Sequence, residues 1–214
     1  MKSKRFALRA WLVAGLLAGS VLAAPPPSMN APELGQGPYS SMHMLLEKTI
    51  LKVDVLTVDV RVSKSAQSKL AALAQGKSYT ADLGKQLADV AIKSDHALVQ
   101  LTFKRDVGLD MWIEAVRENL QQARAAGLIS AALEKRVSAG LPGSFQAIQS
   151  RGYKTGDRVL YRVKPESLRT VVVTKDGTPL IDRTDKDEEA ARVVMASYLA
   201  PGSDFREPLL RSLK

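Results

Sequence analysis

The sequence predicts an α+β fold in which an antiparallel sheet is backed by helices on one face. Two features of the pattern support this prediction. Apolar runs of period two cluster along the chain instead of alternating strictly with helical stretches, and Asp176-Gly177 lies between two β-rich runs, which is a strong hairpin signal. The strands of a hairpin pair antiparallel, so at least this part of the sheet is local and antiparallel.

Residues 1–23 have the features of a secretory signal peptide. Four basic residues precede or enter an apolar run over 10–23, which is shorter than the roughly 20 residues of a bilayer span. Val21 and Ala23 place small side chains before the expected cleavage point, although a buried helix or an uncleaved anchor is the alternative. Residues 24–41 are rich in proline and glycine and predict a solvated leader, which leaves 42–214 as the folded domain. We therefore expect a periplasmic protein without a membrane span in its mature form.

Composition excludes several classes of function. The chain has no cysteine, which rules out disulfides, thiolate metal sites and a cysteine nucleophile, and its two histidines leave little room for a zinc site or a triad. The net charge of +9 falls to about +5 without residues 1–23, and the basic residues are scattered, so nucleic-acid binding is not expected. We predict neither a cofactor nor a metal.

The first strand region covers residues 45–62. Leu51, Val53 and Val55 alternate with polar residues, and the phase then changes so that Leu56 begins a second alternating set. A slip of one residue would turn half of the apolar set to water unless the chain bends there. The pattern predicts one long bent strand, or two collinear strands, with a bulge near Val55 and Leu56.

Helical and alternating segments then follow in turn. Residues 65–75 and 80–92 have apolar faces of helical spacing, and 96–105 alternates as a strand. A helix is expected over 110–126, where Gly127 ends it.

The last third of the chain predicts two further helices, a strand pair and two terminal helices. Ser130 caps a helix that ends at Gly140, and a short helix covers 144–150. After Gly156-Asp157 the pattern predicts two strands joined by the tight turn at Asp176-Gly177. Asp185 and Glu188 have capping-box spacing for a helix that reaches Leu199, and a final helix is expected over 204–213.

The order of several landmarks resembles the chalcone isomerase-like family. They are LKVDVLTV at 51–58, Lys-Arg-Asp-Val at 104–107, Arg-Glu-Asn at 117–119, Gly-Asp at 156–157 and SYLAPGSDFREPLLRSL at 197–213. The resemblance implies an open-faced β-sandwich, a large antiparallel sheet with a layer of helices, with a ligand cleft between the two. The family contains isomerases that close a chalcone to a flavanone and non-catalytic relatives that bind fatty acids.

The resemblance also implies where an isomerase would carry its reactive groups. Ring closure needs cations and hydroxyl donors directed at the oxygen on which negative charge develops. The matching positions hold Met42 for an arginine, Asp54 for a threonine, Glu114 for a lysine, Trp112 for a tyrosine and Ala191 for a hydroxyl residue, while Asn119 is retained. We therefore predict no catalytic residue in this chain.

Binding is the expectation that remains. A carboxylate amphiphile such as a fatty acid needs a cation at the mouth of the cleft and an apolar lining, and the candidate residues are Lys52, Trp112, Arg117 and Asn119. The simpler interpretation is that Trp112 fills the core and Arg117 lies on a solvated face.

Other polar groups have simpler interpretations. Arg105-Asp106 is expected to fix the turn between strand and helix, and Gly156-Asp157 is expected to be a turn device. Met42-His43-Met44 could hold copper, but adjacent residues in a strand face opposite ways. The acidic run 182–189 resembles a calcium loop only in composition and favours a helix N-terminus instead.

Three functional hypotheses follow. The first is an exported, non-enzymatic chalcone isomerase-like protein that binds a small amphiphile between sheet and helices. The second is an isomerase or lyase of another substrate that uses Asp54 as a base beside Lys52. The third is an envelope interaction module with a filled core and no ligand. The sequence does not indicate the oligomeric state.

Overall fold

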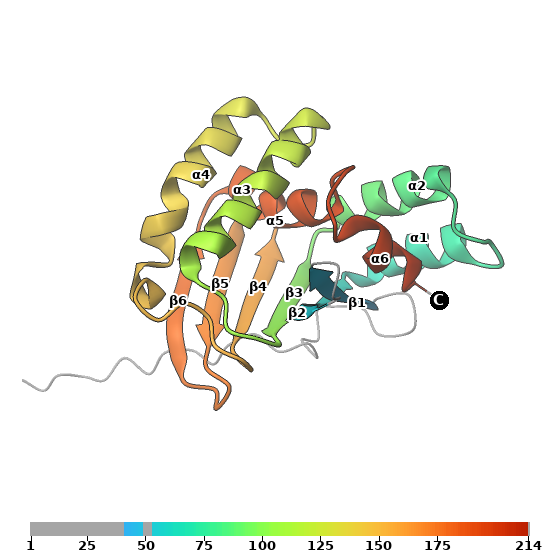
Figure 1. The fold of residues 1–214 in the computed structure, drawn as a ribbon. Coiled ribbons are helices and arrows are strands. Elements are labelled where there is room, and N and C mark those ends of the chain that lie inside the picture. The colour runs from blue at the N-terminus through green and yellow to red at the C-terminus, as the bar shows by residue number, and fades with distance from the viewer. Residues whose placement is uncertain (1–40, 49–52, 214) are drawn as a thin grey trace, which may run out of the picture.

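The computed structural model describes residues 41–48 and 53–213, and these residues form one six-stranded sheet (Figure 1). The strands lie in sequence order and each pairs antiparallel with the next. The expected antiparallel sheet is therefore confirmed as a simple meander. The strands are β1 (Ser41–Lys48), β2 (Val53–Val62), β3 (Ala97–Phe103), β4 (Arg158–Lys164), β5 (Ser167–Val173) and β6 (Pro179–Asp185).

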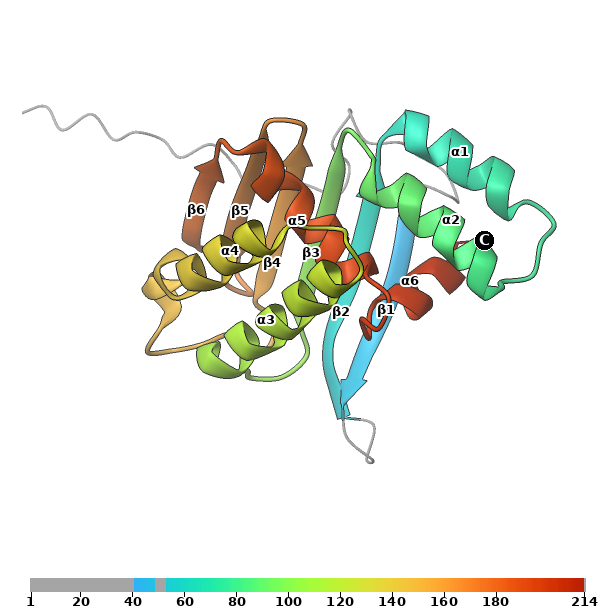
Figure 2. The same ribbon diagram turned by 90° about the horizontal axis from the view of Figure 1, so that it is seen from above.

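The helices lie together on one face of this sheet, as Figure 2 shows from above. Helices α1, α2 and α6 lie on the side of β1 to β3, α3 and α4 lie on the side of β4 to β6, and α5 lies between the two groups. The fold is thus the predicted open-faced α+β sandwich. The helices are α1 (Lys64–Ala74), α2 (Ala81–Ile92), α3 (Leu109–Ala125), α4 (Ala131–Ser144), the short 3₁₀ helix η1 (Gln146–Ile148), α5 (Glu188–Leu199) and α6 (Arg206–Arg211).

The first strand region differs from its prediction. Residues 45–62 do not form one long strand or two collinear ones, because β1 and β2 run antiparallel and pair with each other. The bulge was placed correctly: Leu46 pairs with Leu56 and Glu47 with Asp54, so Val55 is the extra residue. The sequence between the two strands, Thr49-Ile50-Leu51-Lys52, contains none of the glycine, proline, asparagine or aspartate residues that are typical of turns.

The remaining elements follow the predicted order with three local differences. The region after Gly156-Asp157 contains three strands, since β4 and β5 join at Pro165-Glu166 and the predicted tight turn joins β5 to β6. Gly177 has φ +86° in that turn, a conformation that favours glycine. Helix α4 continues past Gly140 through Pro142. Helix α5 is capped by Asp187, whose side chain accepts from Ala190 N, and not by Asp185.

The core lies between the sheet and the helices. It joins the inward faces of β2 and β3 to α2, α5 and α6 in one continuous apolar cluster. A small separate cluster of Leu160, Val171 and Val173 lies on the other face of the sheet. The expected signal peptide and residues 24–40 of the expected leader lie outside the described residues, and Ser41, the last residue of that leader, begins β1. No helix among residues 41–48 and 53–213 is long and apolar enough to cross a bilayer.

Candidate functional site

A cavity of about 820 Å³ lies between the sheet and helices α3, α4 and α5. This volume falls within the range of roughly 300 to 1,000 Å³ that is usual for small-molecule sites. The lining is mainly apolar and includes Val116, Leu141, Phe145, Leu168, Val193 and Val194. The described residues therefore contain the sheet-helix cleft that the resemblance implies, and they do not form the filled core that the third hypothesis requires.

Helix α5 supplies one wall through residues of a single face. Ala190, Val193, Val194, Ser197 and Tyr198 all line the cavity, and their spacing places them along one side of the helix. The opposite side of α5 is also buried, so the helix is apolar nearly all round, as expected for an element enclosed on every side.

Trp112 lies at the boundary between core and cavity. Its ring makes edge contacts with Phe103 and Tyr153, each at 5.6 Å between ring centroids, and its other surface lines the cavity. The side chain is buried, and Trp112 Nε1 has no hydrogen-bond partner among the described residues. Trp112 therefore packs in the core, as the simpler interpretation predicts, and also lines the cavity.

Asn119 also lines the cavity, but its amide is used within the protein. Asn119 Nδ2 donates to the carbonyl of Ala115 at 3.1 Å, and Ser203 Oγ donates to Asn119 Oδ1 at 3.2 Å. The side chain therefore ties the loop before α6 to helix α3. Asn119 therefore contributes to the site by holding this wall of the cavity in place.

Arg117, the third candidate residue, is not brought to this lining. Arg117 lies outside it and donates from Nη2 to the carbonyl of Ser138 at 3.4 Å. Pro142 explains why that carbonyl is free, because proline has no N–H to donate to the residue four positions earlier in the helix. Lys52 lies outside the described residues, as does the side chain of Asp54.

Arg105 is the cation at one end of the cavity. It follows β3, is exposed, and has no ion-pair or hydrogen-bond partner in the described part of the chain. The adjacent Asp106 accepts from Lys154 Nζ and from Thr155 N, both at 2.9 Å, and the hydrogen bond from Lys154 holds the pKa of Asp106 below its ordinary value. Asp106 thus fixes the loop before β4 and not the first turn of α3, which has no side-chain cap.

The opposite end of the cavity carries groups of both charges. Since β3 and β6 run in opposite directions, the residues after β6 lie at the other end of the strands from Arg105. There Arg136 Nη1 pairs with Asp187 at 2.8 Å, and Arg183 Nη2 pairs with Asp185 at 2.6 Å. Lys186 also lines this end. Two of the three cations here, Arg136 and Arg183, are paired with carboxylates.

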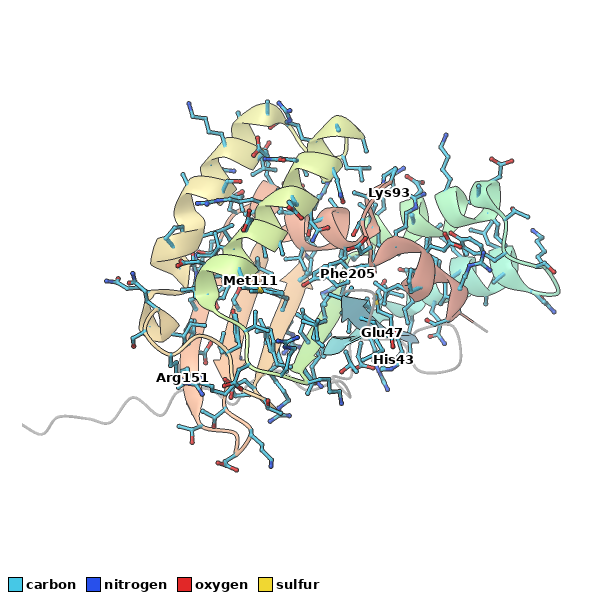
Figure 3. The ribbon with its side chains drawn as sticks, in the orientation of Figure 1. His43, Glu47, Lys93, Met111, Arg151 and Phe205 are labelled. Carbon is cyan, nitrogen blue, oxygen red and sulfur yellow. The ribbon has the colours of Figure 1, made fainter. Side chains whose placement is uncertain are left out.

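The opening beside Arg105 carries an apolar side chain that reaches solvent. Met111 on the first turn of α3 is 68% exposed and lines the cavity (Figure 3). A cation beside an exposed apolar residue provides the two contacts that the head and first carbons of an amphiphile need.

The two segments considered as metal sites, 42–44 and 182–189, make ordinary packing and ion-pair contacts. Met42 and Met44 are buried, whereas His43 is exposed and its Nδ1 lies 2.6 Å from Asp59 Oδ1, so the three side chains do not converge. The acidic run 182–189 pairs with arginines, as Asp182 does with Arg169. In the ranges that the structure describes, no group of three potential ligands could hold a metal ion. Asp157 acts as the expected turn device, accepting from Lys154 N at 2.8 Å.

Two tyrosines that line the cavity are absent from the predicted site residues. Tyr161 lies on β4, and Tyr198 lies on α5 within the landmark at 197–213. Alternation predicts that Tyr161 points inward. It does not show whether the space it faces is filled.

The comparisons with known proteins support the fold. No family model and no curated protein matches the sequence. Among solved structures, a fatty-acid binding protein of Arabidopsis thaliana is similar, with a TM-score of 0.52 and 14% sequence identity, over 81% of this chain and 88% of that one. At this identity the likeness establishes the fold, and membership of the chalcone isomerase-like family stays a prediction.

Proposed function

We propose that this protein binds a small amphiphile with an apolar chain and an anionic head group, such as a fatty acid, in the cavity between sheet and helices. The observation that carries the proposal is the cavity itself, about 820 Å³ of mainly apolar space with Arg105 at one end. The shared fold with a fatty-acid binding protein adds support.

We place the head group beside Arg105 because this cation has no carboxylate partner among the described residues and lies at the same end of the cavity as the exposed Met111. The lining at the far end holds three cations and two carboxylates, and Arg136 and Arg183 there are already paired with Asp187 and Asp185. A ligand carboxylate gains more from an unpaired cation than from one that a protein carboxylate already neutralises.

The proposal includes no reaction. Among the positions that the resemblance assigns to catalytic groups, Met42 and Ala191 are fully buried and do not line the cavity, and Trp112 has no hydroxyl to donate. What the site supplies is shape, apolar surface and a cation at the mouth.

Titration of delipidated protein with stearic acid tests this proposal. The full chain with Trp11→Phe leaves Trp112 as its single tryptophan, so indole fluorescence reports the cavity wall. We expect the emission to change and to saturate at one equivalent of ligand. Absence of any saturable change, together with a bare polypeptide mass after incubation with stearic acid, would overturn the proposal.

Arg105→Gln tests the position of the head group. We expect a two- to fivefold loss of affinity and a weaker dependence on salt, because exposed ion pairs contribute up to about 1 kcal/mol. Lys104→Gln is the matched control, since Lys104 is exposed but does not line the cavity. Equal effects of the two variants would show that only general charge attraction acts.

We also propose export to the periplasm, on the strength of the signal features of residues 1–23. Cell fractionation followed by N-terminal sequencing tests it. A mature protein that begins at Ala24 is expected, and a full-length protein in the cytoplasm would contradict it.

A further inference from the structure

Three buried polar residues form a patch in the wall of the mainly apolar cavity. The patch consists of Tyr161 on β4, Thr170 directly opposite it on β5, and Tyr198 on α5. All three residues are at most 8% exposed, so the patch belongs to the interior and not to the mouth. Because Tyr161 and Thr170 form a cross-strand pair, their side chains are neighbours on the same face of the sheet.

The two tyrosine hydroxyls are unused hydrogen-bond donors. Neither has a hydrogen-bond partner within the described residues. Burial raises the pKa of both phenols well above the ordinary value, and the nearness of Tyr161 raises the pKa of Tyr198 further. Both groups therefore carry their protons at neutral pH and can donate. Trp112 Nε1 is a third unused donor that borders the same space.

A charged group on the ligand, in addition to its head group, does not fit beside this patch. Burial raises the pKa of Tyr153, and the neighbouring phenols and the charge of Asp157 raise it further, so this part of the interior disfavours additional negative charge. Asp157 is itself paired with Arg151 at 2.6 Å, so that cation is already engaged. The acceptor that suits the patch is a neutral oxygen, and the best neutral acceptor is a carbonyl.

We infer that the cavity recognises an oxygenated amphiphile, whose apolar chain carries a ketone or ester carbonyl that accepts hydrogen bonds from Tyr161 and Tyr198. This inference rests on the proposed function and narrows its ligand class. A plain alkyl chain would cover the two hydroxyls without replacing their hydrogen bonds to water, which weakens binding. A carbonyl at the right distance from the head group replaces them.

A positional series of ligands tests the inference. Stearic acid is compared with oxo-stearic acids of the same chain length in which the ketone is moved along the chain, with Trp112 fluorescence as the readout. We expect one position of the ketone to bind about fivefold more tightly than stearic acid, the size that one or two net hydrogen bonds give. Ketones at other positions bind no better than stearic acid, since they meet apolar wall.

Removal of single hydroxyls locates the contact. Tyr161→Phe and Tyr198→Phe should each reduce the preference for the oxo acid. The ratio of the affinity for the preferred oxo-stearic acid to the affinity for stearic acid is expected to approach one. Tyr79→Phe is the matched control, because Tyr79 lies outside the cavity beneath Arg211, at 4.5 Å from ring centroid to guanidinium, and it should keep the full ratio. Thermal melting checks that each variant is folded. If a variant does not fold, the positional series of ligands in the unaltered protein still tests the inference.

The outcomes separate this inference from the proposed function. If stearic acid binds and no oxo acid binds more tightly, the inference is overturned and the proposed function stands. If neither stearic acid nor any oxo acid binds, both are overturned. A ratio that survives both tyrosine substitutions would also overturn the inference, because the preference would then come from other groups.

Discussion

The two faces of α5 meet different interiors. On one side, α2 packs on α5 and α6, and α6 packs on β1, with Leu70, Leu87 and Leu209 at most 1% exposed (Figure 2). We call this side the filled region. On the other side, α3 and α4 stand across the cavity from β4 to β6, and we call this the hollow region.

Side-chain size contributes to the difference. The lining of the hollow region includes Ala115, Gly140, Ala190 and Ser197, which occupy little of the space between layers. The filled region also buries small residues such as Gly84 and Ala88, so spacing matters too: α6 packs closely on β1, whereas α3 and α4 stand farther from β4 to β6. One sheet and one continuous helical layer thus carry a packed core and a ligand-sized space side by side, and equivalent substitutions in the two regions should have different effects.

Alkaline pH should have the largest effect. The raised pKa values of Tyr153, Tyr161 and Tyr198 mean that the folded protein keeps three protons which the unfolded chain loses above pH 10. The contribution of these three groups to the free energy of unfolding is therefore fully present below about pH 10. Above that pH the free energy of unfolding falls by about 4 kcal/mol per pH unit for three such groups. We expect a phenolate titration in which these tyrosines ionise only as the protein unfolds. Smooth ionisation of all five tyrosines in the folded protein would contradict it.

Adjacent substitutions on α5 should sharpen the comparison. Ala196 is 1% exposed and lies outside the cavity lining, so Ala196→Leu should overpack the core and reduce the free energy of unfolding by about 1 to 3 kcal/mol. Ser197 lines the cavity, so Ser197→Leu should fill space, leave the melting temperature nearly unchanged and weaken stearic acid binding at least tenfold. Urea unfolding measures the stability of both variants, and titration with stearic acid measures their affinity for the ligand. Equal loss of stability in both variants would mean that the hollow region is packed.

Two glycines offer the smallest test. A methyl group at Gly140 in α4 meets nothing within 4 Å, so Gly140→Ala should stabilise the helix by about 0.5 to 1 kcal/mol. A methyl group at Gly84 in α2 would collide with the hydroxyl of Tyr79. Gly84→Ala should therefore show no gain, because displacement of Tyr79 offsets the helix propensity. The comparison fails if urea unfolding gives both variants the same gain.

The sequence allowed much of the fold to be predicted because apolar periodicity records which face of an element is buried. It placed the bulge at Val55, although it joined β1 and β2 into one strand, since Thr49-Ile50-Leu51-Lys52 contains none of the residues typical of turns. The helix through Pro142 was shortened for the opposite reason, because proline and glycine are read as helix stops although packing can override them.

The site was predictable only in part. Trp112 and Asn119 were found through the resemblance, and both line the cavity. Arg117 could not be excluded from the sequence, because its partner is a carbonyl freed by Pro142 in another helix. Tyr161 and Tyr198 were missed because periodicity shows that a side chain points inward but not whether a neighbouring side chain fills the space it faces.

Native mass spectrometry of the protein isolated from its own cells tests the central claim most directly. The account predicts a complex heavier than the polypeptide by one small lipophilic acid, which is released on denaturation and is replaced by added stearic acid. A bare polypeptide mass that stays unchanged after incubation with stearic acid would contradict it.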